Sequence, residues 1–541
     1  MTCMNTEGFP ETLYEAFTRS AKRFPERTAV RNTRLQAGER EAVTYSELLQ
    51  MVETLASGLV EHGVKAGERV AIHSRASIHF AAAFLAAAKL GAWVVPLDPQ
   101  LRDAELATLI KASKPGVLFT THEAIGEVCD LVPTIVELGK AGESGFAAML
   151  DKERPPAETA SLSQDAIAVL AFTSGTTGQA KGVLLSHRNL IADAFLSSTV
   201  MPIDENDVFL SIAPWHHLLG LTSSLIVPLV RGAQTMYTSD HRKLAPLLKS
   251  HEVSIFIGVP KLYHALYARM IGQVRQTALG RALLRLAPKV VGRTLRNKLT
   301  GGRLRFFVSG SAPLDGAVST GFRRLGIGLL EGYGLTETSP IVCFCDPFTK
   351  KTATVGPPLP GVEAKLINTN TDGVGELCLR GPIVMQGYFE NESATAAIID
   401  EQGWLHTGDL ATLDADGEIY LKGREKNVIV LESGKNVYPE EMEWEMSSLR
   451  YVEEILVRGR MVNGREVVEA LVYPNEGTLT EDGIVGKEQI HSAVWEGIHE
   501  RQSRLSPHKR LHGRDRLVIV SQPFPKTSTL DIKRHVAVTV T

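Results

Sequence analysis

A glycine- and hydroxyl-rich segment between two apolar runs is the feature that most limits the fold of this chain. Residues 172–182 read FTSGTTGQAKG and combine three glycines, four hydroxyl side chains and one lysine. Apolar runs at 167–172 and 183–185 flank the segment, so the pattern predicts a loop between two strands. Backbone N–H groups and hydroxyls in such a loop can surround a polyphosphate, and Lys181 adds positive charge. A hairpin turn rich in small polar residues is the alternative interpretation.

This segment differs from a Walker A loop, which also binds phosphates. In a Walker A loop, glycine directly precedes the lysine, serine or threonine follows it, and a helix begins there. Here Ala180 precedes Lys181, Gly182 follows it, and the next residues predict a strand. The sequence therefore indicates a phosphate loop of another kind.

Helices and short apolar strands alternate along the first part of the chain. Helices are expected at 12–24, 44–62 and 78–90, and strands at 70–73 and 92–95. The alternation recurs until about residue 338 and is typical of parallel α/β layers. Glycine, proline and short alternating strands at 355–387 predict a small barrel-like β subdomain. Because 541 residues exceed a single hydrophobic core, we expect several domains.

Charge and cysteine content restrict the classes of partner and compartment. A formal net charge of -3 gives no electrostatic case for nucleic-acid binding. The five scattered cysteines suit free thiols in a reducing cytoplasm, and the pair Cys343 and Cys345 is expected to be buried on a strand. Residues 1–7 lack the basic and apolar regions of a signal peptide. The apolar segment at 80–97 is interrupted and too short to span a bilayer.

Three further motifs follow the first one in the chain. They read EGYGLTETSP at 331–340, GWLHTGDL at 403–410, and KGREKN at 422–427, which leads into SGKNVYPEE at 433–441. In order and spacing, the four motifs resemble the signatures of the adenylate-forming superfamily, which includes acyl-CoA ligases, peptide-synthetase adenylation domains and beetle luciferase. The segments at 256–263, 280–299 and 302–314 look most like the long-chain fatty acyl-CoA ligases. The likeness covers essentially the whole chain.

The resemblance predicts the domain organisation. It implies an α/β fold with a large N-terminal domain of layered α/β subdomains plus a small β-barrel-like subdomain, followed by a small mobile α+β C-terminal domain. We expect the N-terminal ATP- and acyl-binding domain at residues 1–423, a hinge at 424–426 and the C-terminal domain at 427–541. In the family the small domain rotates about a residue that matches Lys426.

The resemblance also assigns nucleotide-binding residues. The family's phosphate-binding positions match Thr173, Ser174, Gly175, Thr176, Thr177, Gly178 and Lys181. Tyr333 matches the aromatic residue that stacks on adenine, and the other side of adenine is lined by residues matching Gly310, Ser311, Ala312 and Pro313. Asp409 matches the carboxylate that holds the ribose hydroxyls, and Arg424 the arginine that reaches ribose or phosphate. A structural salt bridge is the alternative interpretation of both charged residues.

Catalytic residues are assigned in the same way. Thr336 resembles the residue that contacts the α-phosphate, and Glu337 the glutamate that binds magnesium, an ion that prefers hard oxygen donors. His217 falls where the family often places a histidine or an aromatic residue near the α-phosphate. The alternatives are a helix-start carboxylate for Glu337 and, for the neighbouring Trp215, either the border of an acyl tunnel or the core.

The C-terminal segment departs from the family pattern. The family carries a lysine here that the small domain brings to the substrate carboxylate and α-phosphate. This chain reads PKTSTLDIKR at 525–534, so Asp531 stands in the position of that lysine. Lys533 lies two residues further on and, in a strand, would point the same way about 6–7 Å along. Losing a preorganised cation costs on the order of 100- to 1000-fold in rate, so slow adenylation is expected.

The expected function is an AMP-forming fatty acid–CoA ligase that uses ATP, Mg²⁺ and coenzyme A, with Gly434 beside the path of CoA. Its partners are expected to be a fatty acid, ATP and CoA, with no nucleic acid, and peripheral membrane contact stays open. Three alternatives are a fatty acyl-AMP ligase that serves a carrier protein, an aryl or short-chain acid–CoA ligase, and a weakly catalytic acyl-nucleotide-binding protein. The last follows from Asp531.

Overall fold

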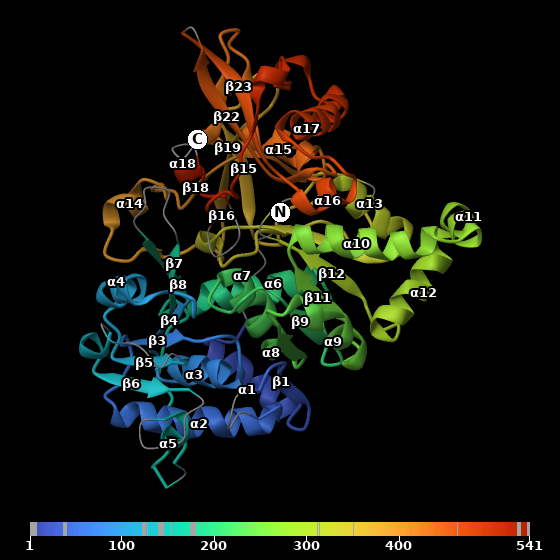
Figure 1. The fold of residues 1–541 in the computed structure, drawn as a ribbon. Helices are drawn as coiled ribbons and strands as arrows, with labels where there is room; N and C mark the ends of the chain where they lie inside the picture. The colour runs from blue at the N-terminus through green and yellow to red at the C-terminus, as the bar shows by residue number, and fades with distance from the viewer. Residues whose placement is uncertain are drawn as a thin grey trace.

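The protein is described from a computed structural model. It describes residues 8–35, 40–121, 126, 128–138, 145–151, 153–173, 180–310, 312, 314–349, 351–462, 464–526 and 532–537. Two large sheets and a small sheet form the N-terminal part, and a separate α+β unit lies above them in Figure 1. Among the described residues, none of the helices combines the length and the apolar character that crossing a bilayer requires.

The first large sheet has seven strands in the order β17-β8-β7-β4-β3-β5-β6. Its strands are β3 (Arg69–His73), β4 (Trp93–Leu97), β5 (Val117–Thr120), β6 (Thr134–Glu137), β7 (Ile167–Thr173), β8 (Lys181–Ser186) and β17 (Gly387–Tyr388). β8 pairs antiparallel with β7 in a register that sets Thr173 opposite Lys181, so the glycine-rich loop joins the two strands of a hairpin. The predicted strands on both sides of the loop are therefore confirmed, and they pair with each other as a hairpin.

The second large sheet has eight strands in the order β14-β13-β12-β11-β9-β10-β1-β2. Its strands are β1 (Thr28–Asn32), β2 (Ala42–Thr44), β9 (Val208–Ser211), β10 (Gln234–Tyr237), β11 (Ile255–Gly258), β12 (Phe306–Ser309), β13 (Gly328–Tyr333) and β14 (Cys343–Phe344). The six inner strands pair in parallel, whereas both edge strands run antiparallel to their neighbours. The expected parallel layers are present. Cys343 and Cys345 are buried as predicted.

Capping residues explain where the first helices begin. Thr12 accepts a hydrogen bond from the amide of Glu15 at the start of α1 (Leu13–Arg23), and Thr44 forms a reciprocal capping box with Glu47 at α2 (Tyr45–Glu61). Ser77 caps α3 (Ile78–Lys89), which is buried along its whole length. The three predicted helices are thus found with ends within two residues of those expected from the sequence.

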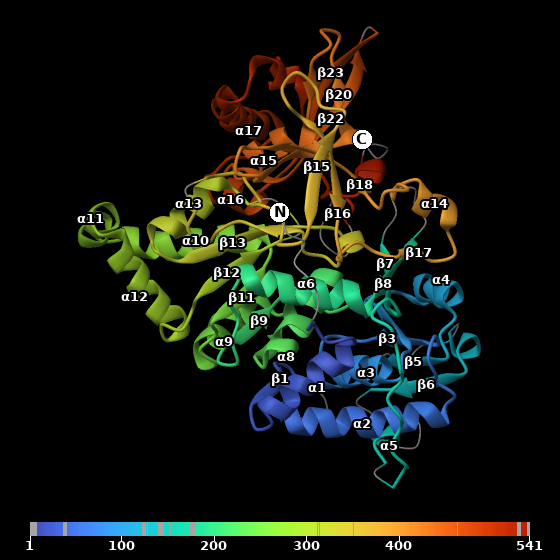
Figure 2. The ribbon, with the colours of Figure 1, turned by 180° about the vertical axis from the view of Figure 1, so that it is seen from behind.

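Further helices cover the two large sheets and connect their strands. They are α4 (Asp103–Ser113), α5 (Phe146–Met149), α6 (His187–Val200), α7 (Leu218–Leu221), α8 (Val227–Arg231), α9 (Leu244–Ser250), α10 (Pro260–Arg275), α11 (Ala278–Leu286), α12 (Pro288–Thr300), α13 (Gly316–Arg324) and α14 (Glu392–Ala396). Figure 2 shows α6 and α8 between the two large sheets. This placement joins the two halves through one shared hydrophobic core.

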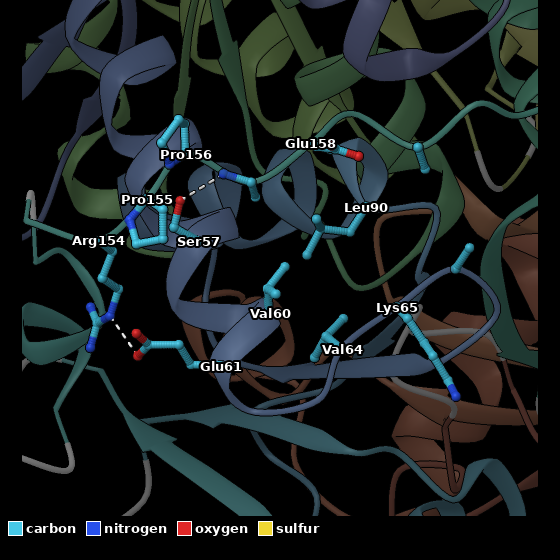
Figure 3. Close-up of a pocket in the computed structure, with 13 residues that line it drawn as sticks. Ser57, Val60, Glu61, Val64, Lys65, Leu90, Arg154, Pro155, Pro156 and Glu158 are labelled. Atoms are coloured by element: carbon cyan, nitrogen blue, oxygen red, sulfur yellow. Dashed lines mark hydrogen bonds and ion pairs between the residues drawn. The ribbon is translucent and has the colours of Figure 1, made fainter.

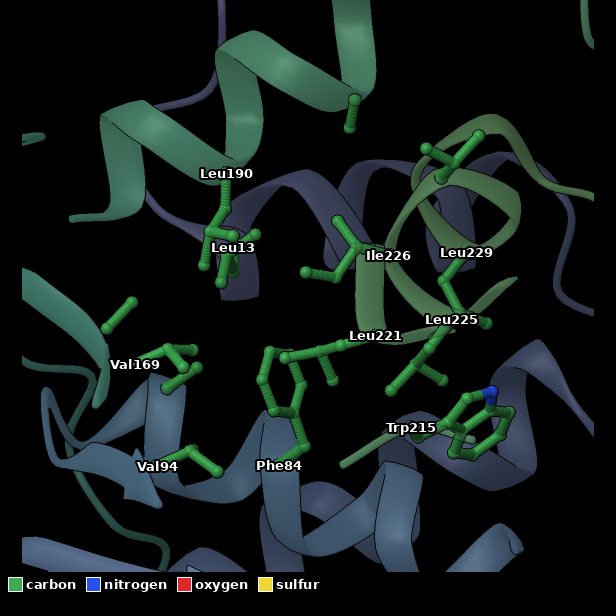
Figure 4. Packing of buried hydrophobic residues seen from close by; sticks show 14 of the residues in the cluster. Leu13, Phe84, Val94, Val169, Leu190, Trp215, Leu221, Leu225, Ile226 and Leu229 are labelled. Atoms are coloured by element: carbon green, nitrogen blue, oxygen red, sulfur yellow. The ribbon is translucent and has the colours of Figure 1, made fainter. Parts of the chain in front are cut away.

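That shared core contains Trp215, which the sequence left between core and acyl tunnel. In Figure 4 the Trp215 ring lies with Leu221 and Leu225 in the same apolar cluster as Phe84 of α3 and Val169 of β7. Its indole N–H donates to the hydroxyl of Ser224 at 3.1 Å, so the one polar atom of the ring is satisfied. The core interpretation of Trp215 is correct.

The remaining strands form smaller sheets. The order β15-β16-β18-β19 makes a four-stranded antiparallel sheet from β15 (Glu363–Ile367), β16 (Gly375–Arg380), β18 (Leu405–Leu413) and β19 (Ile419–Arg424). The C-terminal part holds β20 (Ile429–Val430), β21 (Asn436–Val437), β22 (Val452–Val462), β23 (Arg465–Pro474), β24 (Leu517–Ile519), α15 (Pro439–Ser447), α16 (Glu476–Glu481), α17 (Lys487–Arg501) and α18 (Arg534–Ala537). Its buried apolar residues form a cluster of their own between Ile429 and Leu517.

Acid should destabilise the fold through His187, a buried residue at the start of α6. Its Nδ1 accepts a hydrogen bond from the amide of Leu13 at 3.2 Å, and burial lowers its pKa to about 4. The neutral form is favoured in the fold, so this stability is present above pH 6.5 and is lost as the pH falls toward 4. Between pH 7 and pH 5 we expect His187 alone to lower the free energy of unfolding by about 2 kcal/mol. Urea unfolding of the wild type and His187→Gln at both pH values measures this, and equal pH dependence would contradict it.

Candidate active site

The carboxyl ends of several parallel strands meet at one edge of each large sheet, and most predicted site residues follow these ends. β12 ends at Ser309 before Gly310, β13 ends at Tyr333 before Thr336 and Glu337, and β9 ends at Ser211 before His217. In open α/β sheets, ligands bind outside the carboxyl ends of the strands. The fold therefore places the motifs where a ligand site is expected.

Tyr333, Asp409 and Arg424 form one connected group. The Tyr333 hydroxyl donates to Oδ2 of Asp409 at 2.6 Å, and Nε of Arg424 lies 2.8 Å from Oδ1. Asp409 on β18 is the direct strand partner of Arg424 on β19, which explains their proximity. Burial raises the pKa of Asp409, while Arg424 and Tyr333 oppose this effect. The ion pair of the alternative interpretation is thus present, the ribose-binding role stays a prediction, and each carboxylate oxygen retains acceptor capacity for a further donor.

Glu337 is held by a tyrosine that the sequence analysis missed. The Tyr388 hydroxyl donates to Oε1 of Glu337 at 2.8 Å, and Nζ of Lys181 lies 4.8 Å from the centre of the Tyr388 ring. Burial and the Glu337 carboxylate raise the pKa of Tyr388, so its hydroxyl remains a donor. Tyr388 lies on β17, which pairs with β8. The base of the phosphate loop and the predicted magnesium ligand are therefore linked through one aromatic side chain.

The turn that carries Thr336 and Glu337 is braced from the core. Thr222 donates from its hydroxyl to the carbonyl of Ser339 at 2.8 Å, and Oδ2 of Asp193 accepts from the amide of Ile341 at 2.7 Å. Burial raises the pKa of Asp193 well above its usual range. A Cβ atom at Gly334 would collide with the carbonyl of Pro340, so glycine is required there. The Glu337 carboxylate is thereby presented from a rigid support.

His217 lies in a histidine pair beside an aspartate. The rings of His216 and His217 are 4.3 Å apart between centroids, and Nε2 of His216 is 3.6 Å from Oδ2 of Asp98. Burial lowers the pKa of His217, and burial together with the neighbouring His217 lowers that of His216 to about 2. Both rings are neutral at physiological pH, so they can accept or donate a hydrogen bond but supply no positive charge. The three side chains also lie close enough together to hold a metal ion.

Some predicted residues lie outside the described residues. These are Ser174, Gly175, Thr176, Thr177, Gly178, Ser311, Pro313 and Asp531. At the ends of these gaps, Thr173 and Lys181 face each other across the hairpin, while Gly310 lies against Leu219 and Ala312 is exposed. The roles of these eight residues stay predictions.

The hinge and C-terminal candidates lie on the other side of the site. Lys426 is exposed in a 3₁₀ turn (Glu425–Asn427) directly after β19, and Gly434 lies in the exposed turn between β20 and β21 with a φ of +73°. Lys533 is exposed just before α18. The C-terminal part contacts the rest of the chain through an ion pair between Lys261 of α10 and Glu453 of β22. The Asn370 side chain also donates to the Tyr438 hydroxyl at 3.1 Å.

A cavity of about 480 Å³ lies far from these residues. Figure 3 shows that it is lined by the last turns of α2, including Val60 and Glu61, and by the connection that contains Pro155 and Pro156. Arg154 closes one side through an ion pair with Glu61 at 2.7 Å. It contains none of the predicted site residues, so the strand-end edge is the stronger candidate for chemistry.

Comparison with known proteins agrees with this geometry. Residues 17–389 match the model of the AMP-binding enzyme family, and residues 426–540 match the model of the AMP-binding enzyme C-terminal domain. The chain is 29% identical over 500 residues to long chain acyl-CoA synthetase 6, peroxisomal, of Arabidopsis thaliana, covering 83% of this chain and 71% of that protein.

Two further relatives differ from each other in their named substrates. Long-chain-fatty-acid–CoA ligase FadD15 of Mycobacterium bovis is 30% identical over 458 residues, covering 77% of this chain and 75% of that protein. 4-Coumarate–CoA ligase 3 of Arabidopsis thaliana is 29% identical over 482 residues, covering 84% and 81%. The names of these three relatives therefore agree on CoA ligation and differ on the acid.

Solved structures share the fold. That of the O-succinylbenzoate coenzyme A synthetase MenE from Bacillus subtilis, in complex with ATP and a magnesium ion, matches with a TM-score of 0.78 at 24% identity. The match covers 96% of this chain and 98% of that one. The layered α/β N-terminal region followed by a small C-terminal domain is therefore a known arrangement.

Proposed function

Because this chain belongs to the AMP-binding enzyme family, we propose that it is an ATP-dependent acid–CoA ligase of the AMP-forming type, acting on medium- to long-chain fatty acids. The observation that carries the proposal is that residues of separate motifs meet through side-chain contacts. Lys181 reaches Glu337 through Tyr388, and Tyr333 reaches Arg424 through Asp409. Lys181 supplies a cation, Glu337 a hard oxygen donor, and Asp409 with Arg424 polar groups for the ribose. Binding of a nucleoside triphosphate requires groups of these three kinds.

The proposed reaction has two halves. The acid carboxylate attacks the α-phosphorus of ATP, so that an acyl-AMP forms and pyrophosphate leaves. The CoA thiolate then attacks the acyl carbon, which gives the thioester and releases AMP. The mixed anhydride is already activated, so neither half requires a covalent nucleophile from the protein.

The described residues fit the proposed roles. Lys181 and Thr173 would hold the β- and γ-phosphates with the loop between them, Thr336 the α-phosphate, and Asp409 with Arg424 the ribose. The Glu337 carboxylate keeps acceptor positions besides the one that Tyr388 uses, which suits a Mg²⁺ ligand. The ion would supply charge neutralisation at the phosphates. Neutral His217 would orient the substrate carboxylate by hydrogen bonding.

We propose that residues 1–423 and 427–541 move relative to each other about the hinge at 424–426. In support, β19 ends at Arg424, the separate C-terminal core begins at Ile429, and the two parts are joined by polar contacts such as Lys261–Glu453 and Asn370–Tyr438. Polar contacts of this kind break at low cost during domain rotation. The turn with Gly434 would then approach the site and border the path of CoA. The cytoplasm is the proposed location, in keeping with unpaired Cys129, Cys343, Cys345 and Cys378.

Product analysis tests the proposed function. The protein is incubated with ATP, Mg²⁺ and CoA plus one acid at a time from a panel of C2 to C18 fatty acids, benzoate and coumarate, and products are identified by mass. Acyl-CoA, AMP and pyrophosphate from the C8 to C18 acids are expected. Acyl-CoA only from aromatic or short acids would favour the aryl or short-chain alternative. Acyl-AMP without thioester would favour an acyl-AMP ligase that serves a carrier protein. Absence of any product with every acid would favour an acyl-nucleotide-binding protein.

Tyr388→Phe should reduce ATP use without loss of the fold. The substitution removes the hydrogen bond to Glu337 but keeps the ring beside Lys181. A hydrogen bond to a charged group is worth about 1.5–3 kcal/mol, so a fall of about 10- to 100-fold in kcat/KM for ATP is expected. A fall that excess Mg²⁺ partly restores would place the effect on Glu337. Unchanged kinetics would show that Tyr388 does not position the carboxylate.

A further inference from the structure

Helices α10, α11 and α12 project beyond the edge of the eight-stranded sheet. Both ribbon views place α11 at the far end of one side of the molecule, with α10 leading out to it and α12 returning to the body (Figures 1 and 2). α10 follows β11, whose carboxyl end borders the candidate site. A helix of sixteen residues is about 24 Å long, so α10 separates α11 from that edge by about this distance.

The outer face of α11 and the start of α12 expose large apolar side chains. Leu279 is 70% exposed, Leu283 36%, Leu286 81% and Val290 57%. On α11 the first three are spaced by four and three residues, so they share one face of the helix. Four large apolar side chains are therefore exposed within twelve residues, in contrast to the single exposed hydrophobic residues that soluble proteins tolerate everywhere.

The orientation of this face is fixed by close packing on the opposite side. A Cβ at Gly280 would collide with the carbonyl of Val274 on α10, and one at Gly292 with the carbonyl of Leu325 beyond α13. Leu284 points inward and packs against the second hydrophobic cluster. Two close backbone approaches and an inward leucine mean that the leucines on the outer face are held outward by the fold.

The segment that carries the apolar face is basic and contains no acidic residue. Residues 278–300 contain six basic residues and no acidic one, and neither Asp nor Glu occurs between Glu252 and Asp315. The six are Arg281, Arg285, Lys289, Arg293, Arg296 and Lys298. Lys261 and Arg303, on either side of this segment, form ion pairs with Glu453 and Glu252. In the described part of the chain, none of the six basic residues is in an ion pair. A net charge of -3 for the whole chain makes this local charge a distinct feature.

We propose that this face, formed by Leu279, Leu283, Leu286 and Val290 with the surrounding basic residues, docks on the surface of an anionic lipid bilayer. The leucines would enter the boundary between headgroups and acyl chains, and the arginines and lysines would contact lipid phosphates. The inference deepens the proposed function, because fatty acids of medium and long chain partition into bilayers. Docking would set the strand-end edge about the length of α10 from the lipid.

Charge argues against the other occupants of such a face. A second copy would bring one basic surface against another, and the like charges would repel. Single-stranded nucleic acid would need aromatic side chains on which its bases stack, whereas the exposed apolar residues here are aliphatic. An anionic lipid surface satisfies the basic and the apolar side chains together.

Vesicle flotation with the full-length protein tests the proposal. Vesicles of phosphatidylcholine alone are compared with vesicles that contain 30% phosphatidylglycerol, at about 0.05 M and 0.5 M salt. The wild type should float with the anionic vesicles at least about tenfold more than with the neutral ones, and less at high salt. Leu279→Gln with Leu286→Gln, and separately Arg281→Gln with Arg285→Gln, should each reduce binding about tenfold or more at unchanged melting temperature.

Val485→Gln is the matched control, because Val485 is 73% exposed on the C-terminal part and lies outside this face. It should bind anionic vesicles like the wild type. Absence of wild-type binding, or an equal loss in the control, overturns the proposal. Sedimentation velocity that shows a dimer dissociated by the leucine variant would overturn it in favour of self-association. The readout is binding, so it can succeed or fail independently of the product analysis.

Discussion

Glu337→Gln should lower the rate of ATP-dependent pyrophosphate release by about 100-fold or more while the protein remains folded. The carboxylate is the hard oxygen donor of the proposed Mg²⁺ site, and the amide that replaces it carries no charge. The amide oxygen can still accept the Tyr388 hydrogen bond, so the change in packing is small. Initial rates of pyrophosphate release, with thermal unfolding of the same samples, measure both effects.

Glu363→Gln provides a matched control for charge. Glu363 on β15 forms an ion pair with Arg380 at 2.9 Å, and both side chains are largely exposed. Its loss should leave the rate within about twofold, because exposed ion pairs contribute little. If Glu337→Gln instead lowered stability and activity in parallel, its carboxylate would be a structural start of the 3₁₀ turn and not a metal ligand.

Local sequence signals predicted the parts of the fold that depend on local chemistry. Thr12, Thr44 and the apolar run at 78–90 carry caps and periodicity that hardly depend on the rest of the chain, and the helices formed there. The strands around the phosphate loop were predicted for the same reason. Hydrophobic patterning indicates which element forms and which face is buried, because both are decided over a few residues.

Contacts between distant segments could not be predicted in this way. Tyr388 meets Glu337 across 51 residues, and Asp193 meets Ile341 across 148. Such pairs depend on sheet order, here on the return of β17 to the edge of β8, and no periodicity near Tyr388 signals it. The Asp409–Arg424 pair is intermediate: the motifs indicated both residues, but only the β18–β19 register sets them opposite each other.

The exposed face of α11 shows a second limit of sequence reasoning. A basic, apolar helical pattern at 280–299 is consistent with a solvated face or with a face toward anionic lipid. The structure shows that Leu284 points inward and Leu286 outward. Which of these leucines is exposed depends on tertiary packing, which a helical pattern does not encode.

The basic residues near Asp531 differ in how free they are to replace the family lysine. Lys526 is paired with Glu454, and Arg534 is paired with Glu443 and lies 3.6 Å from Glu440. Lys533 is exposed and, in the part of the chain that the structure describes, forms no ion pair. It is therefore the basic residue of this segment that could reach the substrate at least cost, since moving either of the others leaves a largely buried carboxylate unpaired.

Asp531→Lys should raise the rate of the first half-reaction by about 100-fold, because it replaces an anion with a cation beside the charge that develops at the α-phosphate. In the proposed domain rotation, the second half-reaction uses another orientation of the small domain, so pre-made acyl-AMP with CoA should give thioester at nearly the wild-type rate in both proteins. Asp531→Asn is the matched control, since it removes the negative charge without adding a positive one. Its rate in the first half-reaction should lie between those of the wild type and Asp531→Lys.

Lys533→Ala tests whether Lys533 supplies the cation for any residual ATP-dependent activity of the wild type. If Lys533 supplies the cation in the wild type, its loss should remove the residual ATP-dependent rate, and Asp531→Lys should restore that rate in the double variant. The restoration follows because either lysine would serve the same α-phosphate. Pyrophosphate release that is equal in wild type and Asp531→Lys, with both proteins folded, would show that the cation at this position does not limit adenylation. The neutral site around His217 and the charged pair at Asp409 would then have to account for the rate by positioning alone.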